Sequence, residues 1–590
     1  MAALVAIVSF LLYAPSLTYQ LVWDDPLLID GAQAIVAREG VVGLLYSEFH
    51  LETGGQTSLG YFRPVVLVSL WIDHRLSAFL PFSHHLTNVL LNTLNSLLVF
   101  LLLQRLFRRE SAALIGSLLF AVHPVHTEAV AFVSGRTDLW ATFFLLASVN
   151  LWIRESDREE NRRRLFRMGS VAALVLATLS KEVAFLLPPV LLFWSVCGGP
   201  DRDSPPLLRR PRIPAWLGLW ALALTLAVLL RTLAGVGWGT GGSGVTAQVH
   251  LSWGAFLAAA SKLAHYVKLL LVPWPLNAFY TPDQGRLTPT VVVAALAFLG
   301  GCLALSGARH RRTGLVALAW TVGFLLPVLG LVQISTAFVA ERYLYTSSIG
   351  LSLLVAALIE QLPDGAKSQR TALAIASCLL VLPAGATLAR SRVWRDELTF
   401  YTELVRSSPR YAAARYNLAN TLAALQRYPE ALDSYRAAVR LDPFYSQAWY
   451  NLGIALNQAG RWEEAVEANR QTIQLQPRNA NAFNNLGVAQ IMSGDSGAAV
   501  ASFQAALAID PAFADASDNL GLAFEKIGQP EMAAQSYRRA ILQRPGYDLA
   551  HFHLGLLSAR AGDAETAREE HRILVRINPQ LADELRGQLP

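Results

Sequence analysis

The sequence predicts an all-α protein in two parts: a polytopic helical membrane domain in residues 1–390 and an α-solenoid in residues 410–590. The chain of 590 residues is 53% hydrophobic and only 16% charged, whereas ordinary soluble domains carry about a quarter charged residues. Its last third repeats a pattern every 34 residues. Residues 391–409 are expected to form a helix that links the two parts.

Apolar segments recur throughout residues 1–390. A spanning helix needs roughly 20 apolar residues, and the first segment lacks the basic start and cleavage site of a signal peptide. We therefore expect about eleven spans, the first of them uncleaved, and interpret residues 263–274 as an interfacial or re-entrant element. The expected spans are 2–19, 86–103, 111–122, 138–153, 169–180, 183–197, 215–234, 289–305, 314–332, 343–361 and 372–389.

The distribution of basic residues predicts the orientation of these spans. Alternate loops, namely 104–110, 154–168, 198–214, 306–313 and 362–371, hold twice as many lysines and arginines as the intervening segments, in less than half the length. The positive-inside rule places these basic loops in the cytoplasm. Both the loops that carry acidic and histidine motifs and the C-terminal solenoid are then expected outside the cytoplasm.

The C-terminal third has the tetratricopeptide (TPR) pattern, in which each 34-residue repeat forms two helices. We expect about five repeats. The groove of such a solenoid usually binds a peptide or partner protein, and Asn451, Asn485 and Asn519 are candidate groove positions. Prolines mark the period at Pro409, Pro443, Pro477, Pro511, Pro545 and Pro579.

Charge and cysteine content exclude several functions. The formal net charge is +6 and the pI about 9.2, but the basic residues lie in short loops, which argues against a nucleic-acid partner. The three cysteines lie in apolar stretches, which is unlike a disulfide framework or a thiolate metal site. No cofactor is firmly predicted.

Two adjacent carboxylates, Asp24 and Asp25, directly follow the first expected span. One interpretation is a helix N-cap, with Asp25 before the first-turn proline Pro26. The other is a general base that faces a lipid-linked substrate. The residues alone do not decide between them.

The segment from His123 to Asp138 is the richest outer loop in polar residues. The spacing of His123, His126 and Glu128 is not a standard zinc pattern, so we expect a polar cluster that lines a substrate cavity rather than a metal site. Asp138 fits either an N-cap or a membrane-embedded carboxylate with a functional partner such as Arg136.

Cations are predicted at the same outer edge of the membrane. Arg63 alone would suit an interfacial anchor or a phosphate ligand. The pairs Lys181-Glu182 and Glu341-Arg342 are either local salt bridges or parts of a site. Together, Arg63, Lys181 and Arg342 would face the head group of a polyprenyl phosphate. Further polar residues of this edge are Tyr343, which follows Arg342, and His85 and Asn88, which begin the second span.

These motifs together resemble the transmembrane and tetratricopeptide-repeat O-mannosyltransferase family of GT-C glycosyltransferases. The resemblance covers nearly the whole chain, and its most specific element is the stretch HPVHTEAVAFVSGRTD. It rests on Trp23-Asp24-Asp25, Tyr61-Phe62-Arg63-Pro64, His85-x2-Asn88, His123 to Asp138, Ser180-Lys181-Glu182 and Glu341-Arg342-Tyr343-Leu344-Tyr345.

The resemblance implies transfer of a sugar, mannose or another hexose, from a polyprenyl-phosphate carrier to Ser or Thr hydroxyls of a protein that the TPR groove selects. It implies that Asp25 or Asp24, with Asp25 favoured, acts as base, that Arg63, Lys181 and Arg342 hold the donor phosphate, and that the remaining candidates line the cavity. These are His85, Asn88, His123, His126, Glu128, Asp138, Glu182, Glu341 and Tyr343.

Two other functions stay open, a GT-C transferase that modifies glycans or glycolipids and a non-catalytic TPR membrane scaffold. The expected location is a bacterial inner membrane with the repeats in the periplasm, or the endoplasmic reticulum membrane with lumenal repeats if the source is eukaryotic.

Overall fold

The computed structural model describes residues 1–47, 62–77, 80–155, 160–197, 213–234, 252–280, 288–304, 311–330, 339–362 and 365–589. Within these ranges the elements are α-helices and short 3-10 helices, without a strand, which confirms the all-α fold class. The chain divides into two compact units, Met1–Ser408 and Pro409–Pro590.

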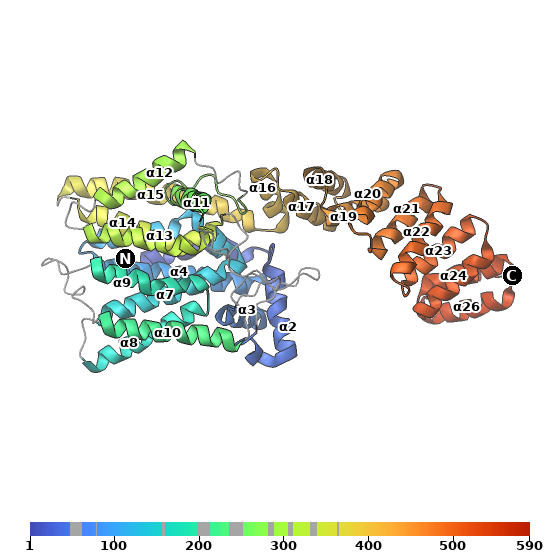
Figure 1. Cartoon of the computed structure of the whole chain (residues 1–590), viewed down its shortest axis with the longest axis horizontal. Helices are drawn as coiled ribbons and strands as arrows, with labels where there is room; N and C mark the ends of the chain where they lie inside the picture. The colour runs from blue at the N-terminus through green and yellow to red at the C-terminus, as the bar shows by residue number, and fades with distance from the viewer. Residues whose placement is uncertain are drawn as a thin grey trace. The chain divides into compact units, whose positions relative to one another are not determined.

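The first unit contains mainly long helices that lie side by side (Figure 1). Helices α1, α4, α5 and α14 pack against one another, as do α7 with α8 and α13 with α14. The α-helices of this unit are α1 (Ala2–Tyr13), α2 (Asp25–Gly43), α3 (Pro64–Ser77), α4 (Pro81–Leu106), α5 (Glu110–Val122), α6 (Thr127–Ala131), α7 (Arg136–Glu155), α8 (Glu160–Thr178), α9 (Leu187–Cys197), α10 (Ile213–Leu233), α11 (Trp253–Leu271), α12 (Pro289–Ala304), α13 (Arg311–Leu325), α14 (Leu344–Glu360), α15 (Ala366–Ser391) and α16 (Glu397–Ser407).

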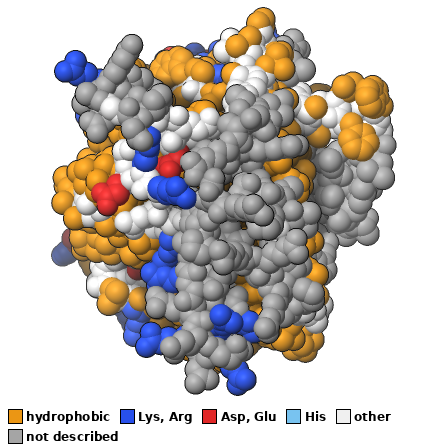
Figure 2. Space-filling view, turned by 90° about the vertical axis from the view of Figure 1, so that its left-hand side faces the viewer, with side chains coloured by type: hydrophobic (Ala, Val, Ile, Leu, Met, Phe, Trp, Pro, Cys, Tyr) orange, Lys and Arg blue, Asp and Glu red, His pale blue; other side chains and the backbone are white. Residues whose placement is uncertain are grey.

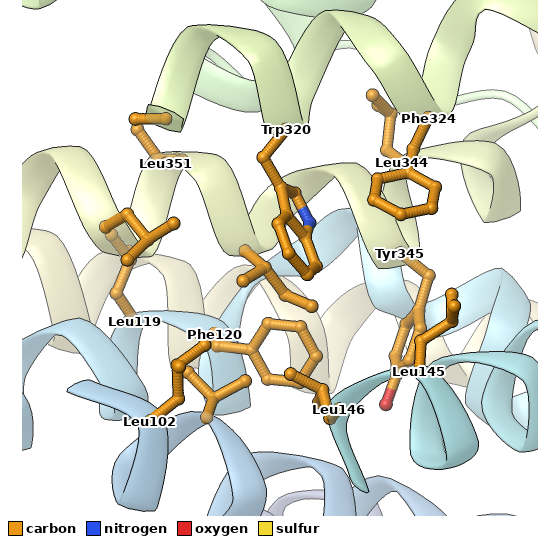
Figure 3. Packing of buried hydrophobic residues seen from close by; sticks show 14 of the residues in the cluster. Leu102, Leu119, Phe120, Leu145, Leu146, Trp320, Phe324, Leu344, Tyr345 and Leu351 are labelled. Atoms are coloured by element: carbon orange, nitrogen blue, oxygen red, sulfur yellow. The ribbon is translucent and has the colours of Figure 1, made fainter. Parts of the chain in front are cut away.

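Large apolar side chains fill the space between these helices. Figure 3 shows Trp320 of α13 above Phe120 of α5 and Tyr345 of α14, and all three are at most 1% exposed. The indole nitrogen of Trp320 donates to the carbonyl of Thr346, at 2.9 Å. This core holds α4, α5, α7, α13 and α14 together, and apolar residues of α2 and α3 form a second buried cluster.

Helices α13 and α14 approach most closely at Gly350. A Cβ atom built there would overlap the hydroxyl of Thr321 and the backbone carbonyl of Ala317. Backbone carbonyls cannot move aside as a flexible side chain can, and overpacking of a dense core is costly.

The variant Gly350→Val is therefore expected to lower the free energy of unfolding by about 1–3 kcal/mol or more. Thermal unfolding of the purified protein in detergent measures this effect. Gly300→Val in α12 is the matched control, because a Cβ there meets open space. Equal melting temperatures for the two variants would contradict the close approach.

Three helices among the described residues are long and apolar enough to cross a membrane, Pro81–Leu106, Trp216–Leu233 and Glu341–Glu360. The bent pair Glu110–Val122 and Pro124–Ala131, with an angle of 47°, makes a fourth if it is counted as one span. Shorter apolar helices include Ala2–Thr18, Glu182–Ser195, Pro289–Cys302 and Thr313–Val328. The remaining spans of the eleven expected from the sequence therefore stay a prediction.

One face of the molecule carries several patches of lysine and arginine side chains and few acidic ones, among many residues that are not described (Figure 2). Residues expected to form the 198–214 and 306–313 loops lie mostly outside the described ranges. The orientation of the spans in a membrane therefore remains a prediction from the distribution of charge.

The segment after α15 packs within the first unit. Residues 391–409 are the predicted linker helix, and the boundary between the two compact units lies between Ser408 and Pro409. Trp394 and Phe400 of this segment are fully buried, and the amide of Gln20 donates to the carbonyl of Arg395, at 2.9 Å. Burial of two large rings fixes α16 to the membrane unit because it removes their apolar surface from water.

The second unit is an α-solenoid, as expected. Between residues 409 and 589 ten helices form five successive pairs, and α27 follows them. A Cβ at Gly487 would lie 2.6 Å from the ring of Phe503, so this motif glycine allows the two helices of its repeat to touch. The helices are α17 (Ala412–Ala424), α18 (Tyr428–Leu441), α19 (Ser446–Gln458), α20 (Trp462–Leu475), α21 (Ala480–Met492), α22 (Ser496–Ile509), α23 (Ala514–Lys526), α24 (Pro530–Gln543), α25 (Asp548–Arg560), α26 (Ala564–Ile577) and α27 (Pro579–Arg586).

The last repeat contains a buried acid–base pair that predicts a pH dependence. A hydrogen bond to Glu570, at 2.5 Å, raises the pKa of His551. Its contribution to stability is fully present below the unfolded pKa of about 6.5 and is lost as the pH rises through the higher folded pKa. Hydrogen exchange of α25 in the full chain, corrected for intrinsic rates, should show lower protection at pH 9 than at pH 6.

The variant His551→Gln should remove this dependence, whereas His571→Gln on α26 should keep it. If His551→Gln kept the wild-type response to pH, the pair would not be its source.

Candidate functional site

Asp25, at the start of α2, is a buried anchor for a second loop. Its side chain is fully buried, and its two carboxylate oxygens accept four hydrogen bonds. One oxygen accepts from the amide and the hydroxyl of Ser134, at 2.8 and 2.7 Å. The other accepts from the amides of Val22 and Val133, each at 3.3 Å. Burial raises the pKa of Asp25 to about 7, although these bonds oppose the shift.

Asp24 has a different environment, although it is the adjacent residue. It occupies the N-cap position of α2 without a side-chain capping bond, and its side chain is partly exposed. Burial raises the pKa of Asp24, and the nearby charge of Arg342 opposes that shift. Of the two carboxylates, Asp24 is thus the less buried one and the one whose pKa a nearby cation affects.

Arg342, the cation near Asp24, binds a second carboxylate, that of Glu128. Its guanidinium forms an ion pair with Glu128, and its backbone amide donates to the same carboxylate, at 2.9 Å. The Glu128 side chain is completely buried, whereas that of Arg342 is 25% exposed. The ion pair therefore holds the arginine side chain in place, and part of that side chain stays exposed.

Lys181 is a second cation near Tyr343. Its ammonium is 2.6 Å from both carboxylate oxygens of Asp138 and 4.9 Å from the centre of the Tyr343 ring. The guanidinium carbon of Arg342 is 5.4 Å from the same ring. A cation over an aromatic face is attracted to it, so Tyr343 holds the two cations near each other.

The third predicted cation, Arg63, donates to Glu182 at 3.1 Å. Arg231 of α10 approaches the other oxygen of Glu182, at 3.4 Å. Glu182 directly follows Lys181 in the chain, so this cluster continues the one around Tyr343. All three cations predicted to hold a phosphate are therefore balanced by carboxylates, and of their side chains Arg342 is the most exposed.

Glu341 is buried away from solvent in a separate network. Arg390 of α15 donates to both of its oxygens, at 3.3 and 3.4 Å, and the hydroxyl of Tyr280 donates to it at 3.0 Å. The amide of Asn277 also donates to it, at 2.5 Å. This network anchors the start of the Glu341-Arg342-Tyr343 turn.

The predicted histidines and Asn88 lie inside the protein. His126 is fully buried between the rings of Phe120 and Tyr345, each 4.6 Å away, and its Nε2 is 2.8 Å from the hydroxyl of Ser348. His123 and His85 are also buried.

The polar bonds of His123 and Asn88 go to nearby protein groups. Nε2 of His123 bonds to the carbonyl of Leu270, at 2.9 Å. The amide of Asn88 donates to the carbonyls of Val130 and Phe132, each at 3.2 Å. Within the described ranges, no three His, Cys, Asp or Glu side chains lie close enough to hold a metal ion.

Sequence reasoning missed a buried ion pair beneath the site. Arg136 and Asp73 of α3 are 2.6 Å apart, and Arg136 also donates to Asn88 and to the carbonyl of His84. Asp73 lies near the end of the mostly apolar helix α3, and nothing close to it in the chain indicates its partner. Arg231 and Arg390 were missed for the same reason, because each finds its partner only through the fold.

Two of the three asparagines predicted to line the solenoid groove, Asn451 and Asn519, join successive repeats through their side chains. Asn451 donates to Asn420 and to the hydroxyl of Tyr416, at 3.0 and 3.1 Å, and Asn519 donates to Asn484 at 3.0 Å. Asn451 also lines a hollow of about 310 Å³ together with Tyr428, Tyr435, Ile454 and Gln458.

Two family models match the chain. Residues 63–231 match the model described as dolichyl-phosphate-mannose-protein mannosyltransferase. The tetratricopeptide repeat model matches four times, at residues 399–446, 416–477, 450–512 and 519–582. The first match includes the loops of Arg63, Glu128, Asp138 and Lys181.

The chain is also similar to curated proteins named as protein O-mannosyl-transferases. The chain is 26% identical to "Protein O-mannosyl-transferase F38B6.6" of Caenorhabditis elegans over 70% of its own length and 59% of the relative. It is 28% identical to "Protein O-mannosyl-transferase TMTC4" of Homo sapiens over 70% and 63% of the respective lengths. For Tmtc3 of Drosophila melanogaster the identity is 26%, over 62% and 47%. The chain thus spans about half to two thirds of the length of these relatives.

Among solved structures, the chain is similar to MamA, with 23% identity and a TM-score of 0.27 over 28% of this chain and 97% of that one. It is also similar to the TPR protein YrrB, with 22% identity and a TM-score of 0.28 over 32% and 97%.

Proposed function

Since the chain belongs to the family of O-mannosyltransferase-like membrane proteins that carry tetratricopeptide repeats, we propose that it transfers a hexose, mannose in the first instance, from a polyprenyl-phosphate carrier to Ser or Thr hydroxyls of a protein. The observation that supports this most directly is the proximity of a partly exposed carboxylate, Asp24, to a partly exposed cation, Arg342.

In the proposed reaction, Asp24 is the general base. The pKa of a Ser or Thr hydroxyl lies far above neutral pH, so its oxygen becomes nucleophilic only as the proton leaves. The acceptor oxygen forms a bond to the anomeric carbon of the sugar, the proton passes to Asp24, and the bond from that carbon to the phosphate oxygen breaks. The raised pKa of Asp24 makes it a better proton acceptor than an ordinary aspartate.

Arg342 is proposed to stabilise the lipid phosphate as it departs. A cation placed where negative charge develops lowers the barrier most when it is held in position before the reaction. Its ion pair with Glu128 and its contact with Tyr343 hold it in this way. Lys181 and Arg63 extend the positive field along the same edge. Asp25, His123 and Asn88 support the loops from within.

The remaining assignments are part of the proposal. The site faces the non-cytoplasmic side of the membrane, where the sequence places these loops. The TPR unit presents the acceptor protein to it. The sequence predicts a GT-C domain in residues 1–390. We extend this proposed domain to include α16, because α16 packs within the first unit.

The test is a transfer assay with the purified full chain. Mannosyl phosphate carried by an undecaprenyl or dolichyl chain is mixed with a set of Ser/Thr-rich protein acceptors, and peptide mass spectrometry detects the added hexose. GDP-mannose as donor is the control. The proposal is supported if hexose appears on Ser or Thr with the lipid donor and does not appear with GDP-mannose. Transfer to glycolipid instead of protein, or no transfer from any lipid donor, would refute it.

A further inference from the structure

Trp23 has a backbone conformation that a tryptophan rarely adopts. Its φ is +58°, in the left-handed region, which is disfavoured for every residue with a Cβ and especially for bulky ones. It directly precedes Asp24, the residue at the N-cap of α2. Such a conformation persists only where the surrounding structure enforces it, and it is typical of functional sites.

Four aromatic rings enforce it here, and we call them the ring cluster: Trp23, Phe132, Trp394 and Phe400. The ring of Trp23 is 5.7 Å from that of Phe132 and 5.4 Å from that of Phe400. Trp394 lies 4.9 Å from each of these two rings. Apart from Trp23, the members are at most 2% exposed. The ring of Trp23 therefore packs against side chains that are themselves buried.

The same rings lie next to both carboxylates of the first outer loop. Phe132 immediately precedes Val133 and Ser134, whose amides bind Asp25. Trp23 immediately precedes Asp24. The amide of Gln20 also bonds to the carbonyl of Arg395, which follows Trp394. A shift of any ring would therefore move the backbone on which Asp24 sits.

We infer that Trp23 is a positioning residue. Its left-handed backbone, locked by Phe132 and by Phe400 of α16, directs the carboxylate of Asp24 toward Arg342. This inference rests on the proposed role of Asp24 as base. It assigns α16 a part in catalysis that is independent of acceptor binding.

The packing of the cluster predicts what ring removal does. Phe400→Leu keeps an apolar side chain but loses the ring, and Trp23→Gly removes the ring while it tolerates the positive φ. In the full chain, we expect each to lower kcat about 10- to 100-fold, since small misplacements of a reacting group have effects of this size. KM for the lipid donor should change less than about threefold, because Arg342 is untouched.

Two controls separate positioning from stability. Trp23→Phe keeps a ring and should retain most of the wild-type kcat. Phe324→Leu removes a buried ring whose centre lies 5.0 Å from that of Trp320, in the core of the same unit. This variant should lower the melting temperature without a fall in kcat. Wild-type kcat in Trp23→Gly and Phe400→Leu would overturn the inference, as would an equal fall in Phe324→Leu.

Hydrogen exchange tests the cluster even if no transfer is found. The amides of Gln20, Val22 and Asp25 are all hydrogen-bonded within the loop or to Arg395. Their exchange should be at least tenfold faster in Phe400→Leu than in Phe324→Leu. Equal exchange would overturn the inference, whereas an inactive wild-type protein with the expected exchange would refute only the proposed function.

Discussion

The variant Asp24→Asn is expected to lower the rate of hexose transfer about 100-fold or more, because a positioned general base contributes roughly that much. The amide cannot accept the hydroxyl proton. The folded protein should tolerate the change, since Asp24 is partly exposed and makes no capping bond. Transfer kinetics and thermal unfolding of the same preparation measure the two effects.

The neighbouring variant Asp25→Asn should behave differently. An amide nitrogen cannot accept hydrogen bonds, so one oxygen's bonds to Val22 and Val133 are lost in a buried site. We expect a loss of about 1–3 kcal/mol of stability. Asp30→Asn, on the exposed face of α2, is the matched control for charge. If Asp25→Asn stayed stable and inactive while Asp24→Asn stayed active, the roles of the two would be reversed.

The pH profile adds an independent test of Asp24. A base must be ionised to work, so the rate should fall as the pH drops through its pKa. Because burial raises the pKa of Asp24, this fall should begin at a higher pH than an ordinary aspartate would give. An acid limb within the ordinary aspartate range would argue against Asp24 as the base.

The second large effect is expected at Arg342. Arg342→Gln should lower kcat about 100- to 1000-fold, as loss of a charge-stabilising group does in other enzymes. It should also destabilise the fold, because it leaves the buried carboxylate of Glu128 without its cation. Transfer kinetics together with thermal unfolding separate these two consequences.

The double variant Glu128→Gln, Arg342→Gln separates the effect of Arg342 on stability from its effect on the rate. Removal of both charges should recover most of the stability but none of the rate, since no cation then faces the phosphate. Arg38→Gln, with 67% of its side chain exposed, is the control for surface charge. Recovery of the rate in the double variant would show that Arg342 serves the fold alone.

Candidate site residues differ in how far the sequence could identify them. The sequence identified Asp24, Asp25 and Arg342 as chemically unusual at a membrane edge. The family resemblance favoured Asp25 as the base, whereas the burial and hydrogen bonds of Asp25 lead us to propose Asp24. The two carboxylates are adjacent and of one type, so only the approach of Ser134, 109 positions away, distinguishes them. The sequence also suggested that His123 and His126 line a substrate cavity. The structure shows both side chains buried, and their place in a cavity stays a prediction.

The solenoid could be predicted almost completely from the sequence. Each of its helices packs on near neighbours in the chain, so a 34-residue period specifies both the repeat and its contacts. The glycine at 487 and the aromatic at 503, for example, meet within one repeat. In the solenoid, the residues that repeat along the chain are also the residues that pack together. Contacts between distant segments therefore contribute little to its structure.

The sequence by itself determined the helical fold, the division into an apolar and a repetitive part, and the residue types at the candidate site. Only the tertiary structure decided which carboxylate is anchored, which cation stays exposed and that α16 supports the first outer loop. These depend on contacts between segments more than 100 residues apart, such as Trp23 with Phe400. Such contacts form because burial of many side chains at once is favourable, and no short stretch of sequence encodes that sum.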